Sequence, residues 1–593
     1  MRHANAQRYG YLLDYELWIC GKPQVDGFHI LGYVPRSPSQ RFSSYQLLAS
    51  FEFCVEDGSA LRPSIQGKKI PRSPRSLSVL NEIEKWMRDT ETKDQLTKPP
   101  SMPTRILEIE ENGQCVILCN SANIYERYTA LSHCWGIVQP ITFNTQTGEE
   151  LHKGIRTAKL PQSFQDAIWL TIRLGIRYLW IDSLCIIQDD VRDWARESAR
   201  MHEVYGNAAL TIAASRSAGN TEGFLGDRLE PRYISIPFSS GEISDEVLCF
   251  ATPLKYAVDL TKQTSLEDAP LSSRGWALQE RFMSQRTLHF TQSQVLVEYK
   301  GNVRAEDSGF TITLPKKAGL FLEAAADPTR IRHQWTYMVE QYSHRKLTIG
   351  NDKLPALAGI AALFSRQATT NESSTEYLGG LWSNDLLQHL CWNIDTRVVP
   401  GVRPTGYRAP TWSWACVDGV VSYHWGRRDN ELAFIQRTHV GLKYPEIPFG
   451  EVIGGWIHLK GTKLPINRKE NDDSFFNFAI GDVRLYAHAE WDAEPHVITE
   501  QYSRAADEAA LVLLPLIWDD VPDESKFICG PFFLILKPVN LQVPPHMGIQ
   551  TYQRIGSCVA LGEGVDNKIM KGLIKSTWID VTERRALEDI ILI

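Results

Sequence analysis

The 593-residue sequence contains no Cys-x-x-Cys pair and no apolar run of the roughly 20 residues that a bilayer-spanning helix needs. Its first residues, Met1 to Asn5, are not followed by the apolar core of a secretory signal. The 11 cysteines are odd in number, and most lie in apolar segments. Together these absences predict a soluble, reduced, cytoplasmic protein without disulfides.

Several kinds of chemistry also lack their motifs. The sequence has no phosphate loop, no Gly-x-Gly-x-x-Gly fingerprint, no His-Glu-x-x-His and no Gly-x-Ser-x-Gly elbow. Its 15 histidines are scattered, so no metal site is expected, and no cofactor is indicated with certainty. A formal net charge of -7 gives no general attraction to nucleic acid, so no nucleic-acid partner is expected.

The length predicts several domains, and changes in composition suggest four parts. We expect a small mixed N-terminal extension over 1–102, an α/β domain over 103–300, a helical segment over 301–400 and a β-rich region over 401–593. Asn112-Gly113 lies between two apolar runs near the start of the second part, and this is a strong hairpin signal.

The second part is organised around short apolar runs that alternate with helical patterns. Strands are predicted at 128–133, 177–182 and 208–214, and helices at 160–175 and after Asp189 or Asp190. Strands linked by helical crossovers favour a parallel sheet with both faces covered. The fold class is therefore α/β, with a mostly parallel sheet flanked by helices.

Polar residues follow each predicted strand, at Ser132 to Gly136, from Asp182 onwards, and at Ser215. Ligands of parallel sheets bind beyond the carboxyl ends of the strands. A third dense segment, Arg274 to Arg281, surrounds Trp276 with charged side chains. We expect these segments to meet at one edge of the sheet. The structural alternative for the third segment is a buried ion-pair network that holds it onto the sheet.

These motifs resemble the fungal heterokaryon-incompatibility (HET) domain over about 128–281. The resemblance is carried by Ala130-Leu131-Ser132-His133-Cys134-Trp135-Gly136, by Leu160-Pro161 with Phe164 and Asp166-Ala167-Ile168, by Tyr178 to Asp189, by Asp193-Trp194 with Glu197, Met201 and Tyr205, and by Arg274-Gly275-Trp276-Ala277-Leu278-Gln279-Glu280-Arg281. One departure is His133, where the family more often has Tyr. The histidine keeps a ring but adds a titratable group.

The resemblance implies a nonself-recognition effector that promotes programmed cell death and works through an incompatibility partner or self-assembly. It also implies a distant relation to TIR domains, which have a flavodoxin-like sheet and some of which cleave NAD with a helix-borne glutamate. NAD is therefore a possible substrate. A further alternative is a HET-domain protein recruited to a biosynthetic pathway, because fold alone does not fix function.

Three residues are candidates for catalysis and six for ligand binding. Glu197 shares a helix face with Trp194 and Met201, although Arg177, Arg196 or Arg200 could instead pair with it. Asp182 and His133 each end a predicted strand. The structural alternatives are capping or an arginine partner for Asp182, and a filled aromatic position for His133. The ligand-binding candidates are Ser132, Trp135, Gly136, Arg274, Gln279 and Glu280.

The predicted redox state can be tested directly. Thiol titration of the denatured, unreduced protein should count 11 free thiols, because no pair of cysteines is expected to be oxidised. A shortfall of two would indicate a disulfide and contradict the cytoplasmic assignment.

Overall fold

The computed structural model describes residues 16–21, 27–34, 44–94, 101–137, 141–252, 266, 268–307, 311–313, 328–368, 375–424, 431–465, 467–468, 475–480, 483–493, 511–518, 531–541, 543, 548–561 and 587–593. The chain divides into two compact units. The first comprises Met1–Trp194 and Glu203–Gly319, and the second comprises Ala195–His202 and Leu320–Ile593.

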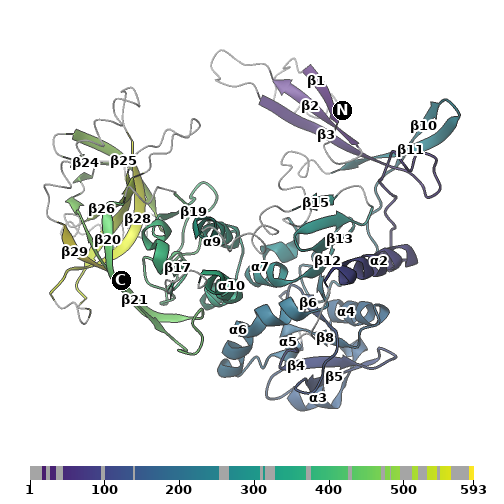
Figure 1. Ribbon diagram of the computed structural model, residues 1–593, viewed down its shortest axis with the longest axis horizontal. Helices are drawn as coiled ribbons and strands as arrows, with labels where there is room; N and C mark the ends of the chain where they lie inside the picture. Colours follow the sequence, from purple (N-terminus) through teal and green to yellow (C-terminus); the bar gives the residue numbers. More distant parts are fainter. Residues whose placement is uncertain are drawn as a thin grey trace. The chain divides into compact units, whose positions relative to one another are not determined.

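The first unit contains a ten-stranded sheet of order β15-β14-β13-β12-β9-β6-β8-β4-β5-β7 (Figure 1). Its strands are β4 (Arg105–Ile109), β5 (Cys115–Asn120), β6 (Tyr128–Ser132), β7 (Ile155–Arg156), β8 (Tyr178–Trp180), β9 (Leu210–Ala213), β12 (Arg286–Phe290), β13 (Val295–Tyr299), β14 (Asn302–Ala305) and β15 (Thr311–Thr313).

The four central strands, β8-β6-β9-β12, are parallel to one another, which confirms the predicted pairing of the first three. The other pairings in this sheet are antiparallel: β4 pairs with β8 and β5, β5 with β7, and β12 to β15 form a meander. The prediction of a mostly parallel sheet is therefore wrong for the sheet as a whole. Short turns, such as the one at Asn112-Gly113 between β4 and β5, return the chain antiparallel.

Helices cover both faces of the parallel core, as Figure 1 shows. On β6, the Tyr128 hydroxyl donates to the carbonyl of Val204 on one face, while the Thr129 hydroxyl bonds Thr171 on the other. Successive strand residues point to opposite faces, so α6 and α4 lie on opposite sides of β6. The helices of this unit are α2 (Leu77–Asp94), α3 (Gly148–Lys153), α4 (Gln162–Arg173), α5 (Asp182–Cys185) and α7 (Gly275–Met283). Helix α6 (Val191–Asn207) begins and ends in this unit, while its residues Ala195–His202 group with the second unit.

Local sequence explains where the two crossover helices begin and end. Phe164, Ala167 and Ile168 of α4 are at most 1% exposed, which is the predicted apolar face. Gly175, with a φ of 69°, follows α4 in a left-handed conformation that suits a helix end. The Asp190 carboxylate caps α6 by accepting from the backbone N–H groups of Arg192 and Asp193.

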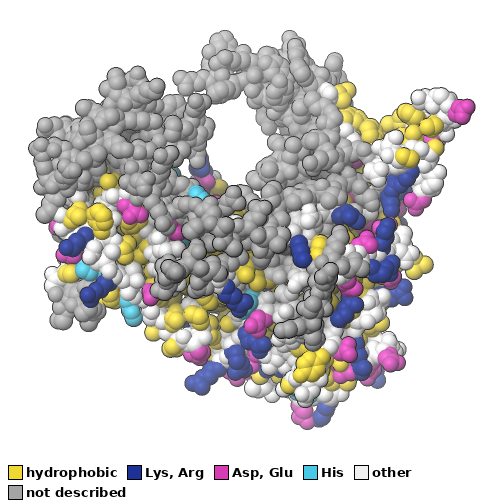
Figure 2. Space-filling view, in the orientation of Figure 1, with side chains coloured by type: hydrophobic (Ala, Val, Ile, Leu, Met, Phe, Trp, Pro, Cys, Tyr) yellow, Lys and Arg dark blue, Asp and Glu magenta, His cyan; other side chains and the backbone are white. Residues whose placement is uncertain are grey.

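A second sheet in the first unit is antiparallel and has the order β1-β2-β3-β11-β10. Its strands are β1 (Glu16–Gly21), β2 (Gly27–Val34), β3 (Ser44–Cys54), β10 (Ile234–Ser240) and β11 (Ile243–Thr252). The edge strand β10 exposes Ile234, Ile236 and Phe238. Figure 2 shows hydrophobic side chains in yellow on the β10–β11 hairpin. Pro237 interrupts this edge, since proline cannot donate a ladder hydrogen bond.

The second unit combines short helices with a β-rich region, as expected for its C-terminal part. Its helices are α9 (Pro328–Ser343), α10 (Ala358–Ala368) and α11 (Leu386–His389), and its small two-stranded sheets are β16 (Tyr377–Leu378) with β17 (Leu381–Trp382) and β18 (Trp392–Ile394) with β19 (Val421–Tyr423). Within the expected helical segment over 301–400, residues 378–392 instead contain strand residues and only short helical turns.

The large sheet of the second unit has the order β20-β21-β29-β28-β25-β24-β23, with β22, β26 and β27 joined to it through β28. Its strands are β20 (Ala433–Leu442), β21 (Val452–Gly461), β22 (Leu464–Pro465), β23 (Asn467–Arg468), β24 (Phe475–Ile480), β25 (Val483–Trp491), β26 (Val512–Trp518), β27 (Pro531–Val539), β28 (Thr551–Leu561) and β29 (Glu588–Leu592). The predicted division into four parts remains a prediction.

Nine cysteines have side chains within the described parts of the chain, and all nine are free thiols. Cys20 and Cys529 lie outside that set. Among the described helices, none is long and apolar enough to cross a membrane.

Candidate functional site

The candidate site lies where β6 and β8 end at their carboxyl termini. Ser132 is the last residue of β6, and His133 follows it. Asp182 comes two residues after β8 and opens the short helix α5, where its carboxylate accepts from the backbone N–H of Ser183 at 2.8 Å. All three residues are at most 6% exposed. The parallel core thus places three buried polar side chains at one edge.

Arg274, the residue before α7, joins this edge to the third motif. Its Nη2 donates to Asp182 Oδ2 at 3.1 Å, and its Nη1 donates to the carbonyl of His133. Nη1 also lies 3.5 Å from Glu280 Oε1 on α7. One guanidinium therefore contacts two buried carboxylates from different segments.

Two further hydrogen bonds close the network. The Trp135 indole Nε1 donates to Asp182 Oδ2 at 3.0 Å, and the Ser132 hydroxyl donates to Glu280 Oε2. The predicted convergence of the three segments is confirmed by these contacts. We call Ser132, Trp135, Asp182, Arg274 and Glu280 the strand-end network.

A second ion pair fastens α7 to the sheet at its other end. Arg281 Nε lies 2.8 Å from Glu298 Oε2 on β13, and His289 Nε2 lies 2.9 Å from the same oxygen. The Glu298 side chain is 1% exposed. The structural alternative expected for this segment, a buried ion-pair network on the sheet, is therefore present.

The pKa values of the two carboxylates in the strand-end network are shifted in opposite directions. Burial acts to raise the pKa of Asp182, but the Arg274 charge and the hydrogen bonds from Arg274 and Trp135 outweigh it, so the pKa is lowered. Burial raises the pKa of Glu280, and the Arg274 charge only partly opposes it. Two carboxylates that share one cation thus differ in how strongly they hold their protons.

His133 is neutral at physiological pH. Its side chain is 1% exposed, and burial lowers its pKa to about 4 against the opposing effect of Asp182. Neither ring nitrogen has a hydrogen-bond partner, and Nε2 lies 3.8 Å from Asp182 Oδ1. The ring packs edge-on against Phe164 at 5.1 Å between centroids. The His133 ring is therefore packed inside the fold.

The other predicted site residues have structural surroundings. Gly136 has a φ of 78°, and a Cβ there would lie 2.9 Å from Gly219 Cα, so a side chain is excluded. Gln279 on α7 is fully buried. Glu197 on α6 is 5% exposed, its Oε1 lies 3.5 Å from Arg196 Nε, and its segment groups with the second compact unit. Arg196 is one of the partners considered from sequence.

Two residues beside the site were not predicted: Tyr205, and Asn220, whose backbone nitrogen would lie 3.7 Å from a Cβ at Gly136. Tyr205 of α6 donates from its hydroxyl to the Leu131 carbonyl at 3.1 Å, and its pKa is raised, chiefly by burial and secondarily by Glu280. Asn220 is 2% exposed, and neither atom of its side-chain amide has a hydrogen-bond partner. Tyr205 is one of the residues that carry the family resemblance, and this was the available signal. Asn220 lies in a loop without any pattern.

The described side chains offer no metal site, because no group of three or more His, Cys, Asp or Glu residues is arranged to hold an ion. The strand-end network consists of groups that already bind one another. This geometry is better suited to hold three chain segments in one arrangement than to bind a substrate.

The first prediction on stability concerns Arg274. Arg274→Met should lower the free energy of unfolding by about 3–5 kcal/mol, since it leaves two buried carboxylates without their cation. The matched control is Arg177→Met, whose side chain is 61% exposed and pairs with Glu108. That control should cost at most about 1 kcal/mol. Urea unfolding measures both, and equal effects would contradict a structural role for the network.

The second prediction concerns pH. Because the folded-state pKa of His133 is about 4, below its unfolded value, the unfolded chain binds more protons between the two values, and stability falls as pH drops. Between pH 6.5 and pH 4.5 this residue should cost wild type about 2–3 kcal/mol. His133→Phe should remove that part of the loss. If the free energy of unfolding, measured in urea, falls equally in the two proteins as the pH is lowered, the lowered pKa of His133 is contradicted.

Comparison with known proteins agrees with the motifs that meet here. No curated protein and no solved structure gave a significant match. Residues 128–280 match the family model described as Heterokaryon incompatibility protein (HET), so the resemblance seen in the sequence is confirmed over the segment that holds the strand-end network.

Proposed function

We propose that this protein is a nonself-recognition effector that promotes programmed cell death in heterokaryon incompatibility. The observation that carries the proposal is the family match over 128–280, which includes every member of the strand-end network. It acts in the cytoplasm through protein partners, either an incompatibility partner or further copies of itself.

The burial of the network supports signalling through partners. Asp182 is 6% exposed, Glu280 is fully buried, and Arg274 joins them. Carboxylates that are already paired with a guanidinium have less capacity to bind a substrate. A domain whose motif residues bind one another is suited to hold a fixed surface for another protein.

A second candidate function is TIR-like cleavage of NAD. The position of the network favours it, because the parallel strands have the order β8-β6-β9-β12, which corresponds to second, first, third and fourth in chain order. That order begins the flavodoxin-type sheet, in which ligands bind where the first and third strands diverge. Ser132 ends the first of these strands, and the raised pKa of Glu280 beside it suits acid–base or electrostatic work.

One experiment tests both functions on the full chain. The protein is expressed from an inducible promoter in a filamentous fungus, viability is scored, and the purified protein is assayed for nicotinamide release from NAD. We expect induction to reduce viability strongly. Folded protein that accumulates without affecting viability, whether or not the host is fused with a strain that carries an incompatibility partner, would overturn the effector proposal.

Glu197→Gln separates the two functions. If the domain cleaves NAD through this carboxylate, the variant should lose roughly a hundredfold or more in release, because one electrostatic stabiliser of the transition state is removed. The matched control is Glu126→Gln, since Glu126 is exposed. Killing by wild type without any nicotinamide release would eliminate the enzymatic candidate and leave assembly.

A further inference from the structure

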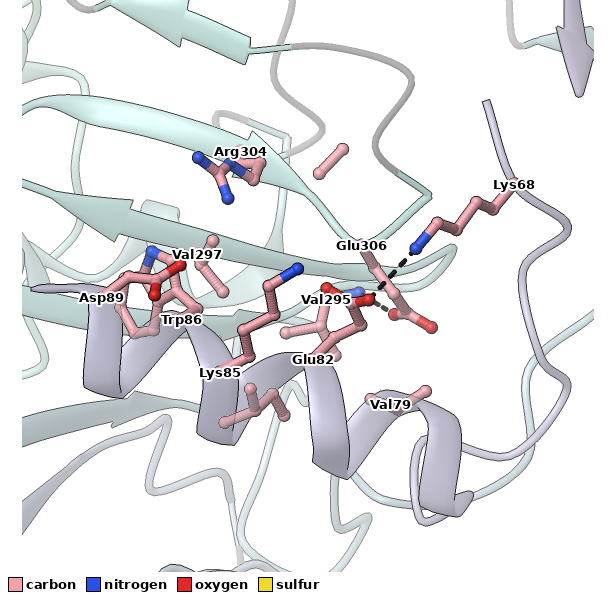
Figure 3. A pocket seen from close by; sticks show the side chains of 12 residues that line it. Lys68, Val79, Glu82, Lys85, Trp86, Asp89, Val295, Val297, Arg304 and Glu306 are labelled. Carbon is pink, nitrogen blue, oxygen red and sulfur yellow. Dashed lines mark hydrogen bonds and ion pairs between the residues drawn. The ribbon is translucent and has the colours of Figure 1, made fainter. Parts of the chain in front are cut away.

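A cavity of about 130 Å³ lies between helix α2 and the strands β13 and β14 (Figure 3). All its walls belong to the first compact unit and lie outside the matched residues 128–280. Its apolar lining is formed by Val79, Ile83, Trp86, Val295 and Val297. Cavities that hold drug-sized ligands are typically about 300–1,000 Å³, so this one suits a smaller molecule.

Among the described residues, two of the three cations that line this cavity form no ion pair, although Glu82 and Asp89 also line it. Lys85 projects from α2 and Arg304 from β14, and Figure 3 shows both side chains extending into the space between helix and strands. Within the described parts of the chain, neither has an ion pair or hydrogen bond. Lys68, the third cation, already pairs with Glu82 at 3.1 Å.

The buried acid of the cavity is also already neutralised. Glu306 Oε2 lies 2.8 Å from Arg228 Nη1, behind the lining, and accepts from the Val295 N–H at 2.7 Å. The other oxygen, Oε1, has no partner although the side chain is only 7% exposed. An unpaired buried acceptor favours a ligand with a donor group at this position.

We propose that this cavity binds a small organic anion that also carries a hydroxyl or ammonium group. Lys85 and Arg304 bind the anionic end through charge-assisted hydrogen bonds. The donor group of the ligand satisfies Glu306 Oε1, and its short carbon chain rests on Trp86 and the valines. A ligand held this way bridges α2 to the β13–β14 hairpin.

The position of β13 gives such binding a consequence for the matched domain. Val297 faces the cavity, while the next residue, Glu298, holds Arg281 of α7 at 2.8 Å. Neighbouring residues of a strand point to opposite faces, so β13 contacts both the ligand and the helix that carries Glu280. The bound state therefore stabilises the strand that fastens the third motif.

Calorimetric titration of the full chain with three matched probes tests the proposal. Glycerol 3-phosphate has both the anion and hydroxyl donors, propyl phosphate lacks the hydroxyls, and glycerol lacks the charge. We expect glycerol 3-phosphate to bind in the millimolar range or tighter and more weakly as salt rises, propyl phosphate to bind several-fold more weakly, and glycerol not to bind. Equal affinity for the two phosphates would overturn the role of Glu306.

The double variant Lys85→Gln/Arg304→Gln locates the binding. Both side chains are exposed, so the fold should be retained, which a thermal melt verifies. Glycerol 3-phosphate should bind at least about tenfold more weakly, because two hydrogen bonds to a charged group are lost. Arg88→Gln, on the same helix but outside the cavity and 69% exposed, should bind like wild type. No binding by wild type, or full affinity in the double variant, would overturn the site.

Discussion

The guanidinium of Arg274 is the interaction on which the rest of the domain depends. It lies within hydrogen-bond or ion-pair distance of Asp182, Glu280 and the carbonyl of His133, which come from three different stretches of the chain. Burying two carboxylates is costly unless a cation and hydrogen bonds compensate them. The parallel strands, α5 and α7 must therefore reach their positions together, or this charge cluster stays uncompensated.

Much of the parallel core could be predicted from sequence because its signals are local. Apolar runs of strand length, helical periodicity in Phe164, Ala167 and Ile168, and the Asp190 cap each act within a few residues. The β4–β5 hairpin could be predicted from its Asn112-Gly113 turn, but the antiparallel meander from β12 to β15 was not predicted, because strand pairing is a non-local property. The β13 strand shows the same apolar pattern whether its neighbour is parallel or antiparallel, and only the short turn to β14 determines the direction.

The candidate site was likewise predictable only in part. Polar residues after buried strands correctly predicted which segments meet, since strand ends of a parallel core lie at one edge. Their protonation could not be predicted, because the low pKa of His133 and the raised pKa of Glu280 both follow from burial. The contact of Tyr205 with the Leu131 carbonyl depends on how α6 sits on the sheet. The charged cavity was also out of reach, as α2 and β14 are far apart in the chain.

The charged side chains of the first unit differ in burial and in how completely they are paired. Asp182, Glu280 and Glu298 are almost fully buried, and each is paired with an arginine, so these clusters fix the geometry of the matched domain. At the α2 cavity, on the other face of β13, Glu306 has one oxygen unpaired, and Lys85 and Arg304 are exposed without partners. Charges that are paired within the protein hold the structure together, whereas the exposed Lys85 and Arg304, which form no ion pair within the described residues, are free to bind an anion from outside. Because β13 carries residues of both kinds on opposite faces, this strand is where an external ligand and the internal network can influence each other.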